Sequence, residues 1–545
     1  MPITVEFPSQ NSVQLNQPIL GTELFALYPP ARPAVAMRVN HYLRPLSWQI
    51  DADAAVTPVD TSTFEGVWVY RNTLSFALIM ACHRALGKGL TVRHSISDAL
   101  YWVFNDGTAM TPSDVASIDA ELRRLVAADM PIQREILSLD KVVRIFNAQG
   151  KQDTAKLLAL TAVDPVEVYR SADLYCCFYG PLMPSMGELD RFSVEPLEDG
   201  LALRFPTVAS PDGLPAYTPL PKVSRVFSEF GNWLKTIGVT TMADLFDVVN
   251  SGGDADVVLL AEALHSQRFA QLAEEIVKDP ERRMVAIAGP SSAGKTTSAQ
   301  RLKIQLRITG ALPVTLSLDD YYLDEITTVD EHGEPDFESI EALDLERLEK
   351  DLQSLVEGRP TKVPIFDFTR HRRSGERTVS LGDKGILVME GLHALNDRLV
   401  GMIKAEQRFG LFVAPMTGVS LDGHNRTSTT DNRLLRRMVR DYMTRGYSPE
   451  ETLKVWPSVI RGGNKYIFPY QQNADAMFNS VLFYELAVLK SLVEPLLRRI
   501  EDSSPVYGEA QRLLGILRFV PVLSAHLVPN NSVLREFIGG SVVAI

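Results

Sequence analysis

The clearest pattern of apolar and polar positions lies in the second half of the chain. Three short apolar runs, Met284–Ala288, Pro313–Leu318 and Gly385–Met389, each end at glycine or at an acidic residue. Continuous apolar runs of this length are typical of strands that are buried on both faces of a parallel sheet. Between the first two runs, Ser298–Leu306 has the Leu and Ile spacing of a helix. The order strand, loop, helix, strand predicts a parallel α/β domain.

Other patterns elsewhere predict a multidomain protein of α/β and α+β type. Residues 1–60 alternate like a small β-rich unit, with strands expected at Thr4–Phe7 and Ala34–Asn40. Pro206–Pro221 is rich in proline and indicates a linker, whereas Val223–Lys278 has helical spacing and predicts a packing collar. We therefore predict five parts, which are residues 1–60, 61–205, 206–280, 281–500 and, as a C-terminal cap, 501–545.

Composition narrows the classes of function. The chain has 545 residues, of which 45% are hydrophobic, so several buried cores are expected. A net charge of −12 argues against broad nucleic-acid binding. Cys82, Cys176 and Cys177 have neither disulfide nor metal-site spacing. The chain begins unlike a signal peptide and has no apolar run of membrane length, so we expect a cytoplasmic protein.

The loop after the first apolar run has the sequence of a P-loop. Its residues are Gly289, Pro290, Ser291, Ser292, Ala293, Gly294, Lys295, Thr296 and Thr297. The glycines allow backbone N–H groups to surround phosphate oxygens, and the following helix adds its positive end. We expect Lys295 to reach the β- and γ-phosphates of ATP and Thr296 to ligate Mg²⁺. The only Asn-Lys pair, Asn464-Lys465, lacks the acid of a GTPase guanine motif, which favours a small-molecule kinase.

Acidic residues follow the other two apolar runs. Asp319 and Asp320 come directly after the second run, and Glu390 directly after the third. Because the carboxyl ends of parallel strands line the ligand crevice, one acid can accept the proton of an acceptor hydroxyl and others can hold Mg²⁺. Glu390 has the position of a Walker B acid. The alternative is that Asp319 and Asp320 only cap the next helix.

A basic segment follows at residues 431–446. Leu434 and Met438 share one helical face, which directs Arg433, Arg436, Arg437 and Arg440 towards the other side. Such runs are often solvated faces, but arginines on a lid neutralise the charge of a transferring phosphoryl group. The position after the P-loop and the Walker B acid favours a lid.

These motifs together identify a resemblance. Residues 281 to about 500 resemble the uridine–cytidine kinase and phosphoribulokinase family. The motifs that carry the likeness are the P-loop, Leu318–Tyr322, Asp336–Glu338 with Ala342–Asp344, Val363–Phe368, Glu390–His393, and the segment from Arg433 to Asp441. The resemblance implies an ATP- and Mg²⁺-dependent kinase with a parallel sheet flanked by helices.

The resemblance also implies roles for individual residues. Asp319 would be the general base on a nucleoside 5′-hydroxyl, and Glu338 and Arg437 would contact the ribose. Arg440 and Arg445 would be lid arginines near the phosphates. The nucleobase pocket would comprise Tyr322, Phe337, Phe368 and His371. Phe366 stands where the family usually has tyrosine, and a lost hydroxyl shifts affinity by about 1 kcal/mol, so the pyrimidine preference is open.

The N-terminal part resembles another family. Val39-Asn40 and Leu43–Leu46 are similar to the TGS domain, a β-grasp module of threonyl-tRNA synthetases, and residues 61–205 extend the likeness into the editing-type domain. That domain uses a His-x-x-x-His pair and a Cys-x-x-x-His pair. Here the aligned residues are Arg71, Ser75, Phe178 and Leu182, so hydrolytic editing and zinc binding are not expected.

The whole chain is similar to bacterial uridine-kinase-related proteins with a synthetase-like N-terminus. An insert at Leu421–Thr430 fits that group, and we expect Asp422 and Arg426 to tune the acceptor site. Two functions stay open at this point. One is a nucleoside kinase, or a kinase of another alcohol, with a structural or regulatory N-terminal half. The other is an ATP-binding regulator that contacts RNA through that half. A homo-oligomer is compatible with both.

Overall fold

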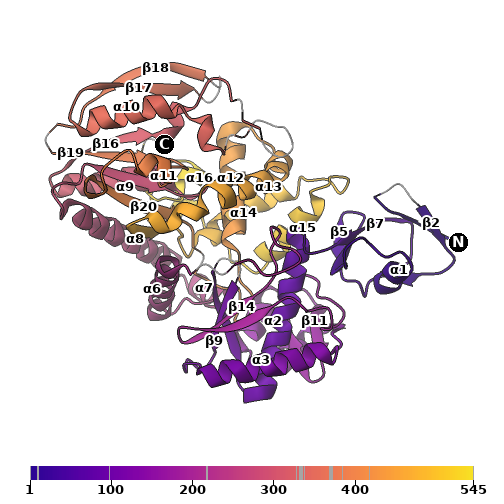
Figure 1. Ribbon diagram of the computed structural model, residues 1–545. Helices are drawn as coiled ribbons and strands as arrows, with labels where there is room; N and C mark the ends of the chain where they lie inside the picture. The colour runs from indigo at the N-terminus through magenta and orange to yellow at the C-terminus, as the bar shows by residue number, and fades with distance from the viewer. Residues whose placement is uncertain are drawn as a thin grey trace.

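The computed structural model describes residues 2–8, 12–96, 99–216, 219–326, 328–329, 336, 338–367, 372–382, 384–416 and 418–543, without the side chain of Ile96. Figure 1 shows a small N-terminal sheet to one side, a mixed α and β region below it, and a larger sheet flanked by helices above. Within the described residues, no helix is both long and apolar enough to cross a membrane.

The N-terminal unit is a five-stranded sheet with one helix. Its strand order is β2-β1-β7-β4-β5, and β1 and β7 run parallel. Val5, Leu24, Met37 and Val56 are fully buried between sheet and helix because alternate strand residues face the same side. The elements are β1 (Ile3–Glu6), β2 (Ser12–Leu15), β3 (Ile19–Leu20), α1 (Gly21–Leu27), β4 (Ala36–Val39), β5 (Tyr42–Arg44), β6 (Gln49–Ile50) and β7 (Ala54–Val59). Strands thus lie where the alternation predicts them.

The next region packs a long buried helix against two sheets. The helix is α2 (Phe64–Leu86), whose continuous buried stretch from Asn72 to Cys82 explains why its sequence shows little amphipathic pattern. The sheets have the orders β13-β14-β9-β8 and β10-β11-β12. The remaining bounds are β8 (Leu90–Ile96), β9 (Ala99–Phe104), α3 (Pro112–Ala127), β10 (Gln133–Leu137), α4 (Leu139–Ala148), α5 (Gln152–Thr161), β11 (Val166–Ser171), β12 (Leu174–Cys176), β13 (Ser193–Leu197) and β14 (Gly200–Arg204).

The C-terminal half contains a parallel five-stranded sheet in the order β16-β19-β15-β20-β21. Every residue of the central strand β15 is buried, as the continuous apolar run predicts. The elements up to β20 are β15 (Met284–Ala288), α9 (Lys295–Ile308), β16 (Leu312–Ser317), α10 (Leu345–Val356), β17 (Thr361–Asp367), β18 (Arg372–Val379), β19 (Gly385–Glu390), α11 (Asp397–Val400) and β20 (Arg408–Ala414). Those after it are α12 (Thr429–Arg440), α13 (Pro449–Tyr466), β21 (Ala476–Asn479), α14 (Glu485–Leu497), α15 (Tyr507–Leu517) and α16 (Arg535–Ile538).

The two halves share a hydrophobic core. The collar consists of α6 (Pro221–Ile237), α7 (Met242–Asn250) and α8 (Asp254–Val277), as its helical spacing predicts. One buried cluster combines Phe146 of α4, Leu234 of α6, Leu434 of α12 and Leu513 of α15. The side chain of Trp233 lies 5.3 Å from Phe483, measured between ring centroids. The halves are therefore joined by packing as well as by the chain between them.

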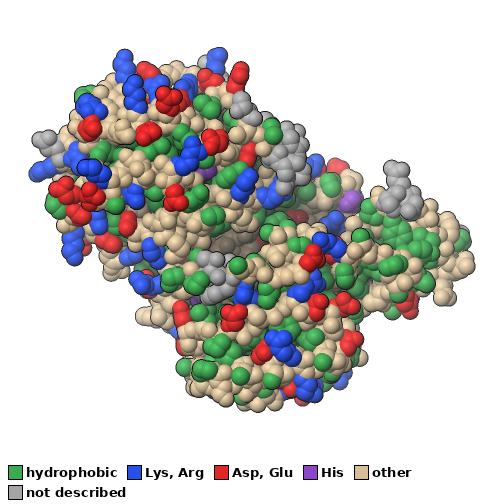
Figure 2. All heavy atoms as spheres, in the orientation of Figure 1, with side chains coloured by type: hydrophobic (Ala, Val, Ile, Leu, Met, Phe, Trp, Pro, Cys, Tyr) green, Lys and Arg blue, Asp and Glu red, His purple; other side chains and the backbone are tan. Residues whose placement is uncertain are grey.

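The surface has no single dominant charge in the view of Figure 2. Lys, Arg, Asp and Glu side chains are interspersed over the C-terminal half, and hydrophobic side chains gather on the N-terminal unit. Interspersed charge of this kind gives no extended basic face on that side, which agrees with the net charge of −12.

Candidate functional site

The loop between β15 and α9 has the backbone geometry of a phosphate cradle. Gly289 lies so close to β20 that an added Cβ would be 1.9 Å from the carbonyl oxygen of Val413. Ser292 and Gly294 have φ values of 61° and 84°, so the loop curls back before α9 begins at Lys295. Successive residues in such conformations turn their N–H groups into one concavity. Lys295 donates from Nζ to the carbonyl oxygen of Pro290 at 3.3 Å.

The carboxyl ends of β16 and β19 lie beside this loop. Ser317 is paired with Glu390 in the strand register, and the Ser317 hydroxyl donates to Oε1 of Glu390 at 3.2 Å. The Thr296 hydroxyl donates to the same oxygen at 3.3 Å. Burial, together with the negative charge of Asp319, raises the pKa of Glu390 to about 7. The sequence-predicted Thr296 and Glu390 are thus brought together.

This group of oxygens fits Mg²⁺. Hydroxyl and carboxylate oxygens are ligands for hard cations, and Mg²⁺ usually takes only one or two protein ligands, with water and phosphate as the others. Within the described residues, no group of three or more His, Cys, Asp and Glu side chains could hold a metal ion. Thr296 and Glu390 are the residues that would hold Mg²⁺.

Asp319 lies among the cationic side chains of the site. It is the second residue of a short 3₁₀ turn, Leu318–Tyr321, directly after β16. Burial raises the pKa of its carboxyl, and the nearby charges of Lys295, Arg445 and Arg440 oppose that shift. Asp320 differs, since its Oδ1 accepts a hydrogen bond from the backbone N–H of Phe366 at 3.3 Å. Of the two acids, Asp319 is thus the one influenced by the cationic side chains, and Asp320 is the one that bonds to β17.

Arginines of α12 and of the π-helical turn after it, Asp441–Arg445, contact the P-loop or stand near it. Arg433 donates from Nε to the carbonyl oxygen of Ser291 at 2.9 Å, and Arg437 donates to the Ser291 hydroxyl at 3.1 Å. A further acid, Asp441, forms ion pairs with Arg437, Arg440 and Arg445 at 3.0, 2.7 and 3.7 Å. One carboxylate thus holds the three sequence-predicted lid arginines together.

The alternative that this basic run is a solvated face does not hold for Arg433 and Arg436. Both are buried, and Arg436 forms an ion pair with Glu485 in which neither side chain is more than 1% exposed. The pattern of apolar residues defines one buried face of α12 but does not indicate that the opposite face is covered too. Here the P-loop and the C-terminal segment cover it, since Arg436 also lies 4.9 Å above the ring of Phe537.

Some of the residues predicted to bind the acceptor lie within the described part of the chain. The rings of Tyr322 and Phe366 lie 5.8 Å apart. Oε2 of Glu338 is buried and has no hydrogen-bond partner among the described residues, and its carboxyl feels the charges of Arg437, Lys295 and Arg433. A buried acceptor without a donor is costly unless a ligand supplies one. Phe337, Phe368 and His371, which were predicted to form the nucleobase pocket, lie outside the described residues.

One contact at this site has no signature in the sequence. Oε2 of Glu536, in α16, accepts a hydrogen bond at 2.9 Å from the backbone N–H of Thr297 in the first turn of α9. Val533 packs on the P-loop, where an added Cβ at Gly294 would lie 2.5 Å from its Cγ1. Periodicity and motifs do not reveal a contact between residues 239 positions apart.

The synthetase-like positions lie around an internal cavity or in the core. Phe178 and Leu182 are buried core residues. Arg71 and Ser75, both on α2, line an inner cavity of about 70 Å³. Asp422 and Arg426, which are expected to tune the acceptor site, contact the N-terminal half, so an effect on the acceptor stays a prediction. Asp422 accepts from the Tyr179 hydroxyl at 3.3 Å, and Arg426 lines the same inner cavity, so the insert packs on the N-terminal half.

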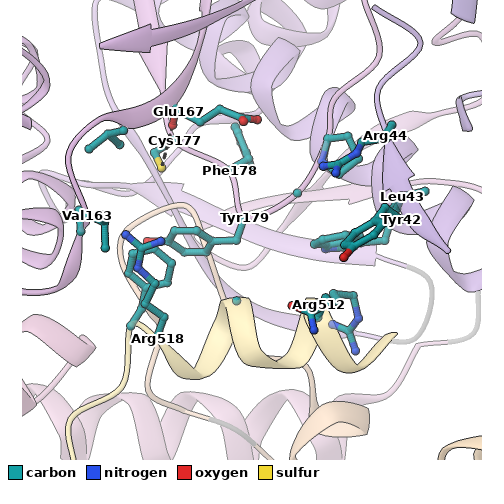
Figure 3. Close-up of a pocket in the computed structure, with 18 of the residues that line it drawn as sticks. Tyr42, Leu43, Arg44, Val163, Glu167, Cys177, Phe178, Tyr179, Arg512 and Arg518 are labelled. Carbon is teal, nitrogen blue, oxygen red and sulfur yellow. Dashed lines mark hydrogen bonds between the residues drawn. The ribbon is translucent and has the colours of Figure 1, made fainter. Parts of the chain in front are cut away.

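A larger outer cavity of about 430 Å³ lies next to the inner one, and Trp68 and Tyr179 line both. Figure 3 shows Tyr42, Leu43 and Arg44 on one side of the outer cavity and Tyr179 and Arg518 on the other, with Arg512 on α15 between them. The outer cavity is therefore built from the N-terminal unit, the synthetase-like region and the C-terminal cap.

Comparison with known proteins shows that the two halves are similar to different proteins. Residues 284–486 match the model of the Phosphoribulokinase / Uridine kinase family. The threonine–tRNA ligase of Acidithiobacillus ferrooxidans is 29% identical over 195 residues, which cover 35% of this chain and 30% of the ligase. The ligase of Acidiphilium cryptum is 29% identical over 176 residues, covering 32% of this chain and 28% of the ligase. The chain thus spans under a third of the length of these relatives.

Two solved structures show a distant similarity to part of this chain. A possible uridine kinase from Bacillus stearothermophilus is 20% identical, with 39% of this chain and 97% of that chain covered and a TM-score of 0.24. The D-glycerate 3-kinase from Cryptococcus neoformans is 15% identical, with coverages of 50% and 87% and a TM-score of 0.21. The C-terminal half of this chain therefore carries a segment of the phosphoribulokinase and uridine kinase family, joined to an N-terminal half similar to threonine–tRNA ligases.

Proposed function

We propose that this chain is an ATP-dependent kinase that transfers the γ-phosphoryl group to an alcohol, with a nucleoside 5′-hydroxyl as the preferred acceptor. The observation that carries the proposal is the position of Asp319, a partly buried carboxylate that lies within the positive charges of Lys295, Arg440 and Arg445. A protein that only senses nucleotide has no need of an acid next to the cations that hold the phosphates. An acceptor hydroxyl does need one.

In the proposed reaction, the acceptor hydroxyl oxygen forms a bond to the γ-phosphorus while the bond from that phosphorus to the β–γ bridging oxygen breaks. The hydroxyl proton passes to the Asp319 carboxylate, and ADP leaves. Lys295 and the arginines gathered by Asp441 neutralise the charge of the transferring group. Mg²⁺, held by Thr296 and Glu390, would supply further charge neutralisation when bound. The protein thus acts mainly by positioning and electrostatics.

A polyhydroxyl acceptor is supported by Glu338. Its buried, unbonded Oε2 requires a donor, and a ribose hydroxyl is a donor of suitable kind. Tyr322 and Phe366 offer aromatic rings for a nucleobase. Phe366 has no hydroxyl group that could form a hydrogen bond to the edge of a nucleobase. A sugar alcohol is therefore the alternative acceptor.

The test is product formation by the purified full-length chain with Mg·ATP and a panel of nucleosides and small sugar alcohols, read by mass spectrometry. We expect a monophosphate of one panel member that is lost in Lys295→Ala and in Asp319→Asn. If ATP binds but no acceptor is phosphorylated, the kinase proposal is wrong. The similarity to tRNA ligases would then favour the ATP-binding regulator that contacts RNA.

A further inference from the structure

Cationic and polar side chains line much of the inner cavity of the synthetase-like region. Its volume of about 70 Å³ corresponds to about two water molecules, enough for a carboxylate or phosphate group. Arg71, Asn72 and Ser75 line it from α2, and Arg426 and Ser428 line it from the insert of the C-terminal half. Residues of both halves of the chain therefore line this cavity.

Arg71 makes no hydrogen bond and no ion pair with any residue of the described ranges. The acid whose charge it feels, Asp431, is bound by Arg512 at 2.5 and 3.1 Å. Arg426 lies 5.9 Å above the ring of Phe227 and feels the positive charges of Arg71 and Arg93. Burial lowers the pKa of Arg71 to about 10 and that of Arg426 to about 9, so both stay charged at neutral pH.

Two guanidinium groups that share one small cavity repel each other and lose solvation there. An anion between them would relieve both effects and accept several of their N–H donors. The side chains of Asn72 and Ser75 add neutral hydrogen-bonding groups to the same wall.

We propose that this inner cavity binds an oxyanion, a phosphate or carboxylate group, through Arg71 and Arg426. The outer cavity, which shares the walls Trp68 and Tyr179, takes the apolar or aromatic body of the same ligand. This binding is independent of the kinase reaction. In this proposal the N-terminal half binds a ligand, although the residues expected for hydrolytic editing are replaced.

The test is isothermal titration of the full-length chain carrying Lys295→Ala, which removes the phosphate-binding lysine of the P-loop. Inorganic phosphate, acetate and phenyl phosphate are the three probes. We expect binding of phosphate or acetate, which identifies the source of the oxyanion. Phenyl phosphate should bind at least tenfold more tightly than phosphate because its ring enters the outer cavity.

Adding Arg71→Ala should weaken binding of the oxyanion at least tenfold. Arg71→Lys should restore part of the affinity and shows that the fold is intact. Arg84→Ala, at an exposed position of the same helix, is the matched control and should change nothing. Absence of binding by all three probes, or equal binding with and without Arg71, would overturn the proposal.

A separate observation concerns the nucleotide site and rests on the proposed function. The N–H of Thr297 is one of the free donors in the first turn of α9, where a phosphate oxygen would bind. The Glu536 carboxylate accepts that hydrogen bond at 2.9 Å. Its charge also adds to the burial that raises the pKa of Glu390. The Glu536 carboxylate of the C-terminal segment therefore occupies the position at which a phosphate oxygen would bind to the first turn of α9.

The segment that carries Glu536 is packed in place. Val533, Leu534 and Phe537 are fully buried, and Val533 lies on the P-loop at Gly294. Arg535 donates to the carbonyl oxygens of Ala525 and Val528 at 3.0 and 2.6 Å, which folds the segment onto itself. Movement of Glu536 away from Thr297 requires at least a local rearrangement of this packing.

We infer that Glu536 is an autoinhibitory group that competes with a phosphate of ATP for the N–H of Thr297. Removal of the carboxylate should tighten Mg·ATP binding about tenfold or more, because a charge-assisted hydrogen bond and a repulsion with phosphate are lost. Glu536→Gln removes the charge, and Glu536→Ala also removes the acceptor. Glu501→Gln, at an exposed acid of the same C-terminal part, is the control.

The measurement is the affinity of Mg·ATP for each full-length variant by isothermal titration. Tighter binding by both Glu536 variants, with Glu501→Gln like the unmodified chain, is the expected result. If the unmodified chain binds ATP and the Glu536 variants bind no better, the inference is wrong and the proposed function stands. If no variant binds ATP, the proposed function itself is wrong.

Discussion

The two halves of the molecule differ in how far their residues match the motifs of the families they resemble. In the C-terminal half, the P-loop, Asp319 and Glu390 keep the residue types that phosphoryl transfer requires, and the fold brings them to one sheet edge. In the N-terminal half, the sequence is similar to part of threonine–tRNA ligases, but Arg71, Ser75, Phe178 and Leu182 stand where the resemblance leads one to expect His or Cys. Similarity to a family therefore does not imply the same reaction.

The largest expected effect is at Asp319. We expect Asp319→Asn to lower kcat by about 10²–10⁴ because the hydroxyl proton loses its acceptor. The affinity for Mg·ATP should not fall, since Lys295 and the P-loop backbone are unchanged. Steady-state kinetics and a separate ATP titration measure the two effects. An equal loss in both would mean that Asp319 holds nucleotide instead of acting on the acceptor.

The free energy of unfolding should distinguish Arg436, which forms a buried ion pair, from Arg71, which lines the inner cavity. Arg436→Met leaves the buried carboxylate of Glu485 without its ion pair, which should lower the free energy of unfolding by about 3–5 kcal/mol. Arg71→Met removes no hydrogen bond to a described residue and should change it by less than about 1 kcal/mol. Urea titrations of both variants measure this difference. A large loss for Arg71→Met would indicate a structural role for Arg71.

Acidification should weaken the junction between the halves. His94 stacks on Phe227 at 4.6 Å, and His265 lies 3.0 Å from the carbonyl oxygen of Val481. Burial lowers the pKa of each to about 3, below the 6.5 of an exposed histidine. Between pH 6.5 and about pH 3, only the unfolded chain binds protons at these two histidines. The free energy of unfolding therefore falls as the pH drops below 6.5.

Each histidine should contribute about 1.4 kcal/mol of this loss per pH unit. Unfolding by urea at pH 7.5, 6 and 5 measures the slope. Phenylalanine cannot bind this proton, so His94→Phe should reduce the slope of unfolding free energy against pH by the contribution of one histidine. An unchanged slope would show that His94 is protonated in the folded chain.

The smallest effect concerns the acceptor. Phe366→Tyr returns the hydroxyl that the resemblance leads one to expect, and a single hydrogen bond changes binding by about 1 kcal/mol. We expect a several-fold lower KM for a pyrimidine nucleoside and no change for a sugar alcohol. Equal KM values before and after the substitution would mean that this ring does not contact the base.

Much of the kinase-like site could be predicted because its motifs are contiguous. The P-loop, Asp319 and Glu390 each lie at the end of a strand of the parallel sheet, and parallel strands place their carboxyl ends at one edge. The partners of Arg436 and the position of Arg426 could not be predicted, because they depend on which surfaces pack together. Glu536 was missed for the same reason, since an ordinary Glu in a C-terminal segment carries no local signal.

The most direct test of the account is acceptor-dependent formation of ADP by the full-length chain and by its Glu536→Ala variant. The account predicts that one alcohol of the panel accelerates ADP formation, that Glu536→Ala requires less ATP for the same rate, and that Asp319→Asn abolishes the acceleration. Slow ADP formation that is the same with every acceptor, and unaffected by Asp319→Asn, would contradict the assignment of this site to phosphoryl transfer.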